Sequence, residues 1–116
     1  MKKAYFLSTC STCTRIIGEL GLKKKGYTFQ DIKTEKITPP QLEEMKTMAG
    51  SYEALFSRVA LKYRALGLNT QKLTENDYKK YILEEYTFLK RPVIITGNHI
   101  FIGNSKSNVA AAAKVV

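Results

Sequence analysis

The sequence predicts an α/β protein with a four-stranded mixed sheet and a block of helices inserted between the two halves of that sheet. A strand, a helix and a second strand follow one another within the first thirty or so residues. This order requires a parallel strand pair with a right-handed crossover. Near the other end of the chain, two short β-branched runs flank a two-residue turn, and a helical segment follows them.

The first half of the sheet lies at the N-terminus. Residues 3–7 form an apolar, aromatic run that predicts a buried strand, and apolar residues at helical spacing follow Cys13. Lys23-Lys24-Lys25-Gly26 predicts the end of this helix, because cations suit its last turn and glycine suits the position after it. Residues 27–32 alternate between apolar and polar side chains and predict the second strand.

Residues 38–87 predict the helical insertion. Thr38 is a capping residue followed by two prolines, and Gln41 stands at the capping-box position. Residues 52–66 are expected to form two short helices. Thr74 is expected to cap a further helix whose first turn is acidic, as the helix dipole favours.

The second half of the sheet follows the insertion. Residues 93–96 and 99–102 flank Gly97-Asn98 and predict a β-hairpin, and a closing helix is expected from about Lys106. The chain has no internal repeat and no low-complexity linker. A single domain over residues 1–116 is therefore expected.

Composition narrows the possible classes of protein. The 116 residues are 44% hydrophobic and 25% charged, which is typical of a soluble globular protein. No apolar run approaches the roughly 20 residues of a membrane helix, and the N-terminal run is too short for a secretory signal, so a cytoplasmic location is expected. The formal net charge of +9 suits anionic partners, and it equally suits a solvated, lysine-rich surface.

Cys10 and Cys13 are the only cysteines, and they lie between the first strand and the first helix. A zinc site would need further ligands, and His99 is the only histidine, so no metal is expected. A Cys-x-x-Cys beside a βαβ unit is a redox motif of thioredoxin-like proteins. Cys10 is predicted to be the nucleophile because a helix N-terminus favours a thiolate, and Cys13, one turn inside, is predicted to be the resolving thiol.

Further candidate site residues are three hydroxyls beside the cysteines, Thr9, Ser11 and Thr12. They are predicted to bind an anionic substrate or to cap the helix, and capping is the expected role of Thr9 or Ser11.

Three of the four arginines are candidates: Arg58 and Arg64 fall within the helical block, and Arg91 directly precedes Pro92. A guanidinium beside Cys10 would stabilise its thiolate and hold an oxyanion through paired contacts, whereas surface salt-bridging is the alternative role. In thioredoxin-like folds the proline before the third strand has a cis peptide bond and packs opposite the active cysteine. Pro92 is expected to do the same and to shape the cleft, and a trans proline that opens a strand is the alternative.

With these pieces placed, the sequence resembles the ArsC/Spx/YffB family of thioredoxin-fold proteins over nearly its whole length. The resemblance rests on five segments: Cys10-Ser-Thr-Cys13, Ala54–Arg58, Tyr63–Leu66, Leu89–Ile94 and Phe101–Asn104. An Arg-Pro before a β-branched strand, together with a helical insertion, is more specific to this family than to thioredoxins generally.

Glutaredoxin-dependent arsenate reductases of this family use a cysteine nucleophile and hold arsenate with three arginines. Cys10 and Arg91 match that pattern, and Arg58 lies near the place of the first arginine. The last arginine's place falls around Gly103-Asn104, where this chain has none. The resemblance implies a small oxyanion or disulfide substrate and a thiol reductant such as glutathione or the glutaredoxin or thioredoxin system as co-substrate. A monomer with no bound cofactor is expected.

Spx-like members of the family imply an alternative. They are regulators that bind RNA polymerase and use a Cys-x-x-Cys disulfide as a switch, and the Arg91-Pro92 element is shared with them. YffB-like members share the glycine-containing ending but commonly hold one motif cysteine. The sequence therefore predicts an arsenate-reductase-like thiol–disulfide oxidoreductase, with a regulator switched by a Cys10–Cys13 disulfide as the alternative.

Overall fold

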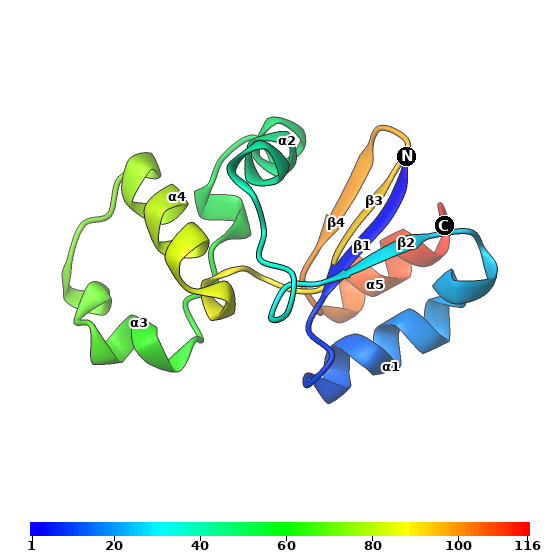
Figure 1. The fold of residues 1–116 in the computed structure, drawn as a ribbon, viewed down its shortest axis with the longest axis horizontal. Coiled ribbons are helices and arrows are strands. Elements are labelled where there is room, and N and C mark those ends of the chain that lie inside the picture. Colours follow the sequence, from blue (N-terminus) through cyan, green and yellow to red (C-terminus); the bar gives the residue numbers. More distant parts are fainter. The chain divides into compact units, whose positions relative to one another are not determined.

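The computed structural model describes residues 1–116, which fall into two compact units (Figure 1). The first, here called the sheet unit, comprises residues 1–36 and 91–116. The second, the helical unit, comprises residues 37–90. The predicted insertion of helices at about 38–87 matches the helical unit to within three residues at each end.

The sheet unit contains a four-stranded mixed sheet. Its strands are β1 (Lys2–Phe6), β2 (Thr28–Asp31), β3 (Val93–Thr96) and β4 (His99–Ile102), in the spatial order β2-β1-β3-β4. β1 is parallel to β2 and antiparallel to β3, and β3 and β4 form the predicted antiparallel hairpin. The α/β thioredoxin-like fold class predicted from the sequence is confirmed.

Two helices, α1 (Ser11–Leu20) and α5 (Lys106–Ala113), cover one face of this sheet (Figure 1). Their apolar side chains and those of the strands form one buried cluster, which removes this face from water and holds α1 in a fixed position. The cluster comprises Ala4, Ile16, Ile17, Leu20, Leu22, Tyr27, Ile94, Phe101 and Ala112.

The predicted end of the first helix at Lys25-Gly26 is wrong. α1 ends at Leu20 because Gly21 adopts a left-handed conformation, with φ of 65°, that L side chains rarely take. The N–H of Gly21 bonds to the carbonyls of Gly18 and Ile17 and so satisfies the end of the helix. The lysines follow in a separate 3-10 turn, η1 (Leu22–Lys24).

The helical unit contains three α-helices and three 3-10 turns: α2 (Pro39–Ala49), η2 (Glu53–Leu55), α3 (Leu61–Ala65), η3 (Leu68–Thr70), α4 (Glu75–Glu84) and η4 (Tyr86–Phe88). The expected caps are confirmed. Thr38 with Gln41, and Thr74 with Asp77, form complete capping boxes at the starts of α2 and α4. No helix of the protein has the length and apolarity needed to cross a bilayer.

An aromatic cluster forms the core of the helical unit around Phe56. The fully buried Phe56 ring stacks on Phe88 at 5.1 Å between centroids and lies 4.9 Å from Tyr78 and 6.0 Å from Tyr63. Backbone bonds flank it: the N–H of Ser57 donates to the carbonyl of Phe88 at 2.7 Å. Aromatic contacts therefore hold the long segment 52–66, which is only partly helical, against α4 and η4.

Candidate functional site

Cys10 lies where the chain leaves the central strand β1 and enters α1. Residues 7–10 make a tight turn, closed by the N–H of Cys10 donating to the carbonyl of Leu7 at 2.9 Å. Cys10 takes the N-cap position of α1 with an extended backbone, φ −95° and ψ 108°. It is thus placed at the positive end of the helix dipole, where backbone N–H groups lack helical partners.

The surroundings of Cys10 favour its thiolate. Partial burial raises the pKa of Cys10, but the N–H and the thiol of Cys13 and the N–H of Thr12 outweigh that effect. The positive charge of Arg91 acts in the same direction. The pKa of Cys10 therefore lies below its ordinary value, as expected for a nucleophilic thiol at a helix N-terminus.

Cys13 lies one turn further along α1 and has the opposite character. Its side chain is 0% exposed, and this burial raises its pKa to about 11, despite an opposing contribution from the N–H of Leu7. The Cys13 thiol also donates toward the Cys10 sulfur, which raises the Cys13 pKa further. Cys13 is therefore a protonated thiol at neutral pH.

The two sulfurs form an asymmetric pair of free thiols. One is half-buried with a lowered pKa, and the other is buried with a raised pKa. Thiol–disulfide exchange requires an accessible thiolate that attacks first and a second thiol close enough to displace the product. The arrangement meets both requirements within one turn of helix.

Arg91 and Pro92 belong to the same unit as the cysteines and directly precede β3. The Arg91-Pro92 peptide bond is cis, as expected. The buried Pro92 also fixes the end of the hairpin, because its carbonyl accepts the N–H of Gly103 at 2.9 Å. Arg91 is half-buried and close enough for its charge to lower the pKa values of both thiols.

The hydroxyls around the cysteines do not cap α1, and the expected capping role of Thr9 or Ser11 is wrong. Cys10 itself holds the N-cap position, and no side-chain hydrogen bond caps the helix. Thr9 precedes the cap in the turn, and Ser11 is already the first helical residue. The N–H groups of Thr12 and Cys13 instead point toward the Cys10 sulfur. The substrate-binding role of these hydroxyls stays a prediction.

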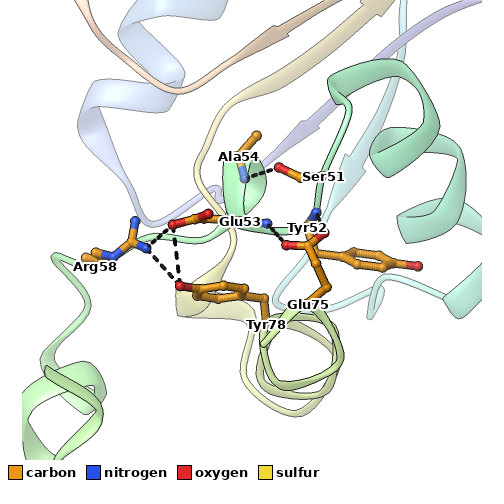
Figure 2. A network of polar contacts seen from close by, with 7 residues as sticks. All are labelled: Ser51, Tyr52, Glu53, Ala54, Arg58, Glu75 and Tyr78. Atoms are coloured by element: carbon orange, nitrogen blue, oxygen red, sulfur yellow. Dashed lines mark hydrogen bonds and ion pairs between the residues drawn. The ribbon is translucent and has the colours of Figure 1, made fainter. Parts of the chain in front are cut away.

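Arg58 and Arg64 lie in the helical unit. The Arg58 guanidinium donates to the Glu53 carboxylate at 2.7 Å and to the Tyr78 hydroxyl at 2.9 Å, and Figure 2 shows how these three side chains meet. The Glu75 carboxylate accepts the N–H groups of Tyr52 and Glu53 in the same network (Figure 2). Arg64 is exposed on α3. The predicted roles of both arginines toward an oxyanion stay predictions.

The sequence-based prediction missed one contact beside the cysteines. The carboxylate of Asp31, at the end of β2, accepts the hydroxyl and the N–H of Ser8, which lies two residues before Cys10. A signal for it was present, because the carboxyl ends of the parallel strands β1 and β2 meet at one edge of the sheet. A polar residue closing the second strand therefore comes next to the turn that follows the first.

No group of three or more His, Cys, Asp or Glu side chains in the structure could hold a metal ion. His99 is exposed on β4, where its ring stacks on Phe101 at 6.2 Å between centroids.

Comparison with known proteins places the chain in a family. Residues 5–112 match the model of the ArsC family, so the chain belongs to that family, and the predicted membership of the ArsC/Spx/YffB group is confirmed. Global transcriptional regulator Spx 2 of Bacillus anthracis is 25% identical over 101 residues, which cover 85% of this chain and 76% of that protein.

Two solved structures have the same fold. The protein named YFFB superposes with a TM-score of 0.80 at 24% identity, over 97% of this chain and 99% of its own. The arsenate reductase of Vibrio cholerae gives a TM-score of 0.78 at 12% identity, over 99% of this chain and 98% of its own. At these identities the likeness establishes the fold alone.

Proposed function

We propose that this protein is a thiol–disulfide oxidoreductase in which Cys10 is the nucleophile and Cys13 the resolving thiol. The observation that carries the proposal is the opposite character of the two thiols within one turn of α1. Cys10 has a lowered pKa at the helix N-terminus, while burial raises the pKa of Cys13 to about 11. Membership of a family that has arsenate reductases among its structural relatives supports the same class of chemistry.

The reaction would proceed in two exchanges. The Cys10 thiolate attacks one sulfur of a substrate disulfide, the S–S bond breaks, and one substrate thiolate leaves while a mixed disulfide forms. Cys13 then loses its proton and attacks the Cys10 sulfur, which releases the second substrate thiolate and closes a Cys10–Cys13 disulfide. The substrate gains two electrons, and a thiol reductant, such as the glutaredoxin or thioredoxin system or two molecules of glutathione, returns them to the protein.

The neighbouring groups assist this sequence at defined points. The Cys10 thiolate is stabilised by the N–H groups of Thr12 and Cys13 and by the charge of Arg91. This stabilisation acts both before attack and when the Cys10 thiolate is the leaving group. The Leu7 N–H favours the Cys13 thiolate at the moment when Cys13 must lose its proton. We propose that the substrate is contacted by Pro92 and by the residues near Cys10 in the sequence, namely Thr9, Ser11 and Thr12.

Arsenate is the less favoured substrate. Its reduction would need the Cys10 thiolate to displace an oxygen of arsenate, followed by attack of Cys13 on the Cys10 sulfur, which leaves arsenite and the disulfide. The oxyanion would also need several arginines, yet Asn104 stands near the place of the last one, and Arg58 is bonded to Glu53 and Tyr78. We therefore propose a disulfide rather than arsenate as the substrate.

The test is turnover of a small disulfide, hydroxyethyl disulfide, with a thioredoxin system as reductant, alongside arsenate under the same conditions. Cys10→Ser is expected to abolish turnover. Cys13→Ser is expected to accumulate a mixed disulfide at Cys10, detectable as added mass on the intact protein. The double variant contains no thiol and is the matched blank. Undiminished turnover in Cys10→Ser would refute the proposal.

A redox-switched regulator is the second candidate, and the similarity to the regulator Spx 2 favours it. In this role the Cys10–Cys13 disulfide would change an interface on the sheet unit rather than complete a catalytic cycle. RNA polymerase is the partner that the Spx resemblance suggests.

Capture of RNA polymerase on the immobilised chain, oxidised and reduced, tests the second candidate. Oxidised and reduced wild type are expected to capture different amounts of RNA polymerase, while Cys13→Ser is expected to capture the same amount under both conditions. Equal capture by both forms of the wild type, together with disulfide turnover, would refute the redox-switched regulator and support the oxidoreductase.

A further inference from the structure

Asp31 ends β2 at the edge of the sheet where β1 releases the chain toward Cys10. The two strands are parallel, and Phe6 lies opposite Asp31. The pairing continues beyond both strands, because the N–H of Ile32 donates to the carbonyl of Phe6 at 2.9 Å. The backbone at Asp31 is therefore fixed next to the turn formed by residues 7–10.

Three hydrogen bonds fix the Asp31 carboxylate, and two of them come from that turn. The Ser8 hydroxyl donates to Oδ2, and the Ser8 N–H donates to Oδ1 at 3.4 Å. The N–H of Lys33 donates to the same Oδ1 at 3.2 Å and keeps the carboxylate from rotating away. The Ser8 hydroxyl is the main cause that lowers the pKa of Asp31, so the group is ionised at neutral pH.

The turn that Asp31 holds contacts both sulfurs. Cys10 closes the turn through its N–H, and its sulfur receives the N–H groups at the start of α1. At the other end of the turn, the N–H of Leu7 points to the sulfur of Cys13. A displacement of the turn would change the electrostatic surroundings of both thiols, because hydrogen bonds weaken steeply with distance and angle.

We propose that Asp31 is a positioning residue for the two cysteines, acting through Ser8 to fix the turn that carries Cys10. Its use in catalysis rests on the function proposed above. Asp31 would influence the reactivity of Cys10 and the reduction potential of the Cys10–Cys13 pair. Neither the hydroxyl of Ser8 nor the carboxylate of Asp31 takes part in the exchange of sulfur bonds.

The experiment compares reduced wild type with Asp31→Ala, Ser8→Ala and the double variant. The rate of alkylation of Cys10 by iodoacetamide is followed from pH 5 to 9 with mass mapping of the site, since Cys13 stays protonated there. Each single variant is expected to lose about threefold to tenfold in rate at neutral pH, an effect of the size of one ordinary intramolecular hydrogen bond. The double variant is expected to equal Asp31→Ala, because the hydroxyl contact that Ser8→Ala removes is already lost when the carboxylate is absent.

The midpoint of the Cys10–Cys13 pair in glutathione redox buffers is a second readout. It is expected to shift in Asp31→Ala and Ser8→Ala by a similar amount and in the same direction. Asp31→Asn, which keeps an acceptor oxygen for Ser8, is expected to lie between wild type and Asp31→Ala in both measurements.

Asp77→Ala is the matched control. Asp77 also accepts a backbone N–H and a hydroxyl from one residue, Thr74, at 2.8 and 3.0 Å, but it lies in the helical unit. This variant is expected to lower the melting temperature without changing the Cys10 titration. If Asp31→Ala and Ser8→Ala also lose only stability, the contact is structural and the positioning role is refuted.

Two further outcomes remain distinguishable. If Asp31→Ala does not fold, Ser8→Ala carries the test, because it keeps the carboxylate and its bond to Lys33. If wild type turns over no disulfide but the alkylation rates still fall as expected, the proposed enzyme function fails and the positioning role stands.

Discussion

The sheet unit and the helical unit use their charges in different ways. The sheet unit holds eleven of the nineteen Lys and Arg residues and three of the ten Asp and Glu residues, a formal excess of eight positive charges. The helical unit holds eight of the former and seven of the latter, an excess of one. The basic character of the protein is therefore a property of the unit that carries the cysteines.

The polar contacts follow the same division. In the helical unit the charged groups satisfy one another, as in the Glu53–Arg58 pair and the Lys62–Glu85 pair. At the cysteine edge of the sheet unit, N–H groups and the Arg91 charge act on two sulfurs instead. Groups whose pKa values are shifted in opposite directions by their surroundings are candidates for function, so reactivity is to be sought at the cysteine edge.

The largest expected effect tests the core of the helical unit. Phe56→Ala is expected to lower the free energy of unfolding by about 3–5 kcal/mol, because it removes a fully buried ring that contacts three other aromatic rings. Urea unfolding followed by circular dichroism measures the loss. Val59→Ala is the control, since Val59 is 91% exposed and should cost less than about 0.5 kcal/mol.

The next effect tests the burial of Cys13 in the sheet unit. The pKa of Cys13 is raised to about 11 in the folded protein, above the roughly 8.5 of an unfolded cysteine. The protonated Cys13 thiol contributes stability that is fully present below about pH 8.5 and is lost as pH rises toward 11. The free energy of unfolding should fall over this range by an amount on the order of 2–3 kcal/mol. The unfolding free energy of reduced wild type should therefore fall more steeply over this range than that of Cys13→Ala. Parallel pH profiles would contradict the assignment.

A pair of arginine variants compares the two units directly. Arg91→Ala is expected to raise the pKa of Cys10, because it removes a positive charge that stabilises the thiolate, and to slow alkylation at neutral pH several-fold. Arg58→Ala, in the helical unit, is expected to leave that rate unchanged. Equal slowing in both variants would show that Arg58 also acts on the thiolate, and the division between the units would then be wrong.

The smallest effect concerns the exposed ion pair of Figure 2. Glu53 and Arg58 are about half exposed, so Glu53→Gln should cost no more than about 1 kcal/mol in unfolding free energy. The loss should shrink further in 0.5 M salt, because salt screens exposed charges. A cost above 2 kcal/mol that is independent of salt would mean that the pair and Tyr78 act as a buried network.

Local patterns predicted most of the elements. The capping boxes at Thr38 and Thr74 and the hairpin around Gly97 were predictable because their signals involve residues only a few positions apart. The end of α1 was mispredicted because two glycines compete for it. Gly21 terminates the helix before the lysines that suggested an end at Gly26. A local rule gives both glycines as possible helix ends and does not choose between them.

The features of the site likewise fall into those that the local sequence predicts and those that depend on how the strands pair. A Cys-x-x-Cys after a strand indicated the order of the two thiols, because position along a helix decides which sulfur meets the free N–H groups. The contact between Asp31 and Ser8 joins residues 23 positions apart. Their pairing depends on the register of β1 against β2, which spacing along the chain does not specify.

The sequence alone determined the class of fold, the pair of thiols and the Arg91-Pro92 element, because each is written in neighbouring residues or in the order of elements. Only the tertiary structure decided the burial of Cys13, the contact of Asp31 with the cysteine turn, and the sharing of Arg58 between Glu53 and Tyr78. The physical reason is that burial and hydrogen bonding depend on which distant segments meet, and those meetings are set by packing of the whole unit.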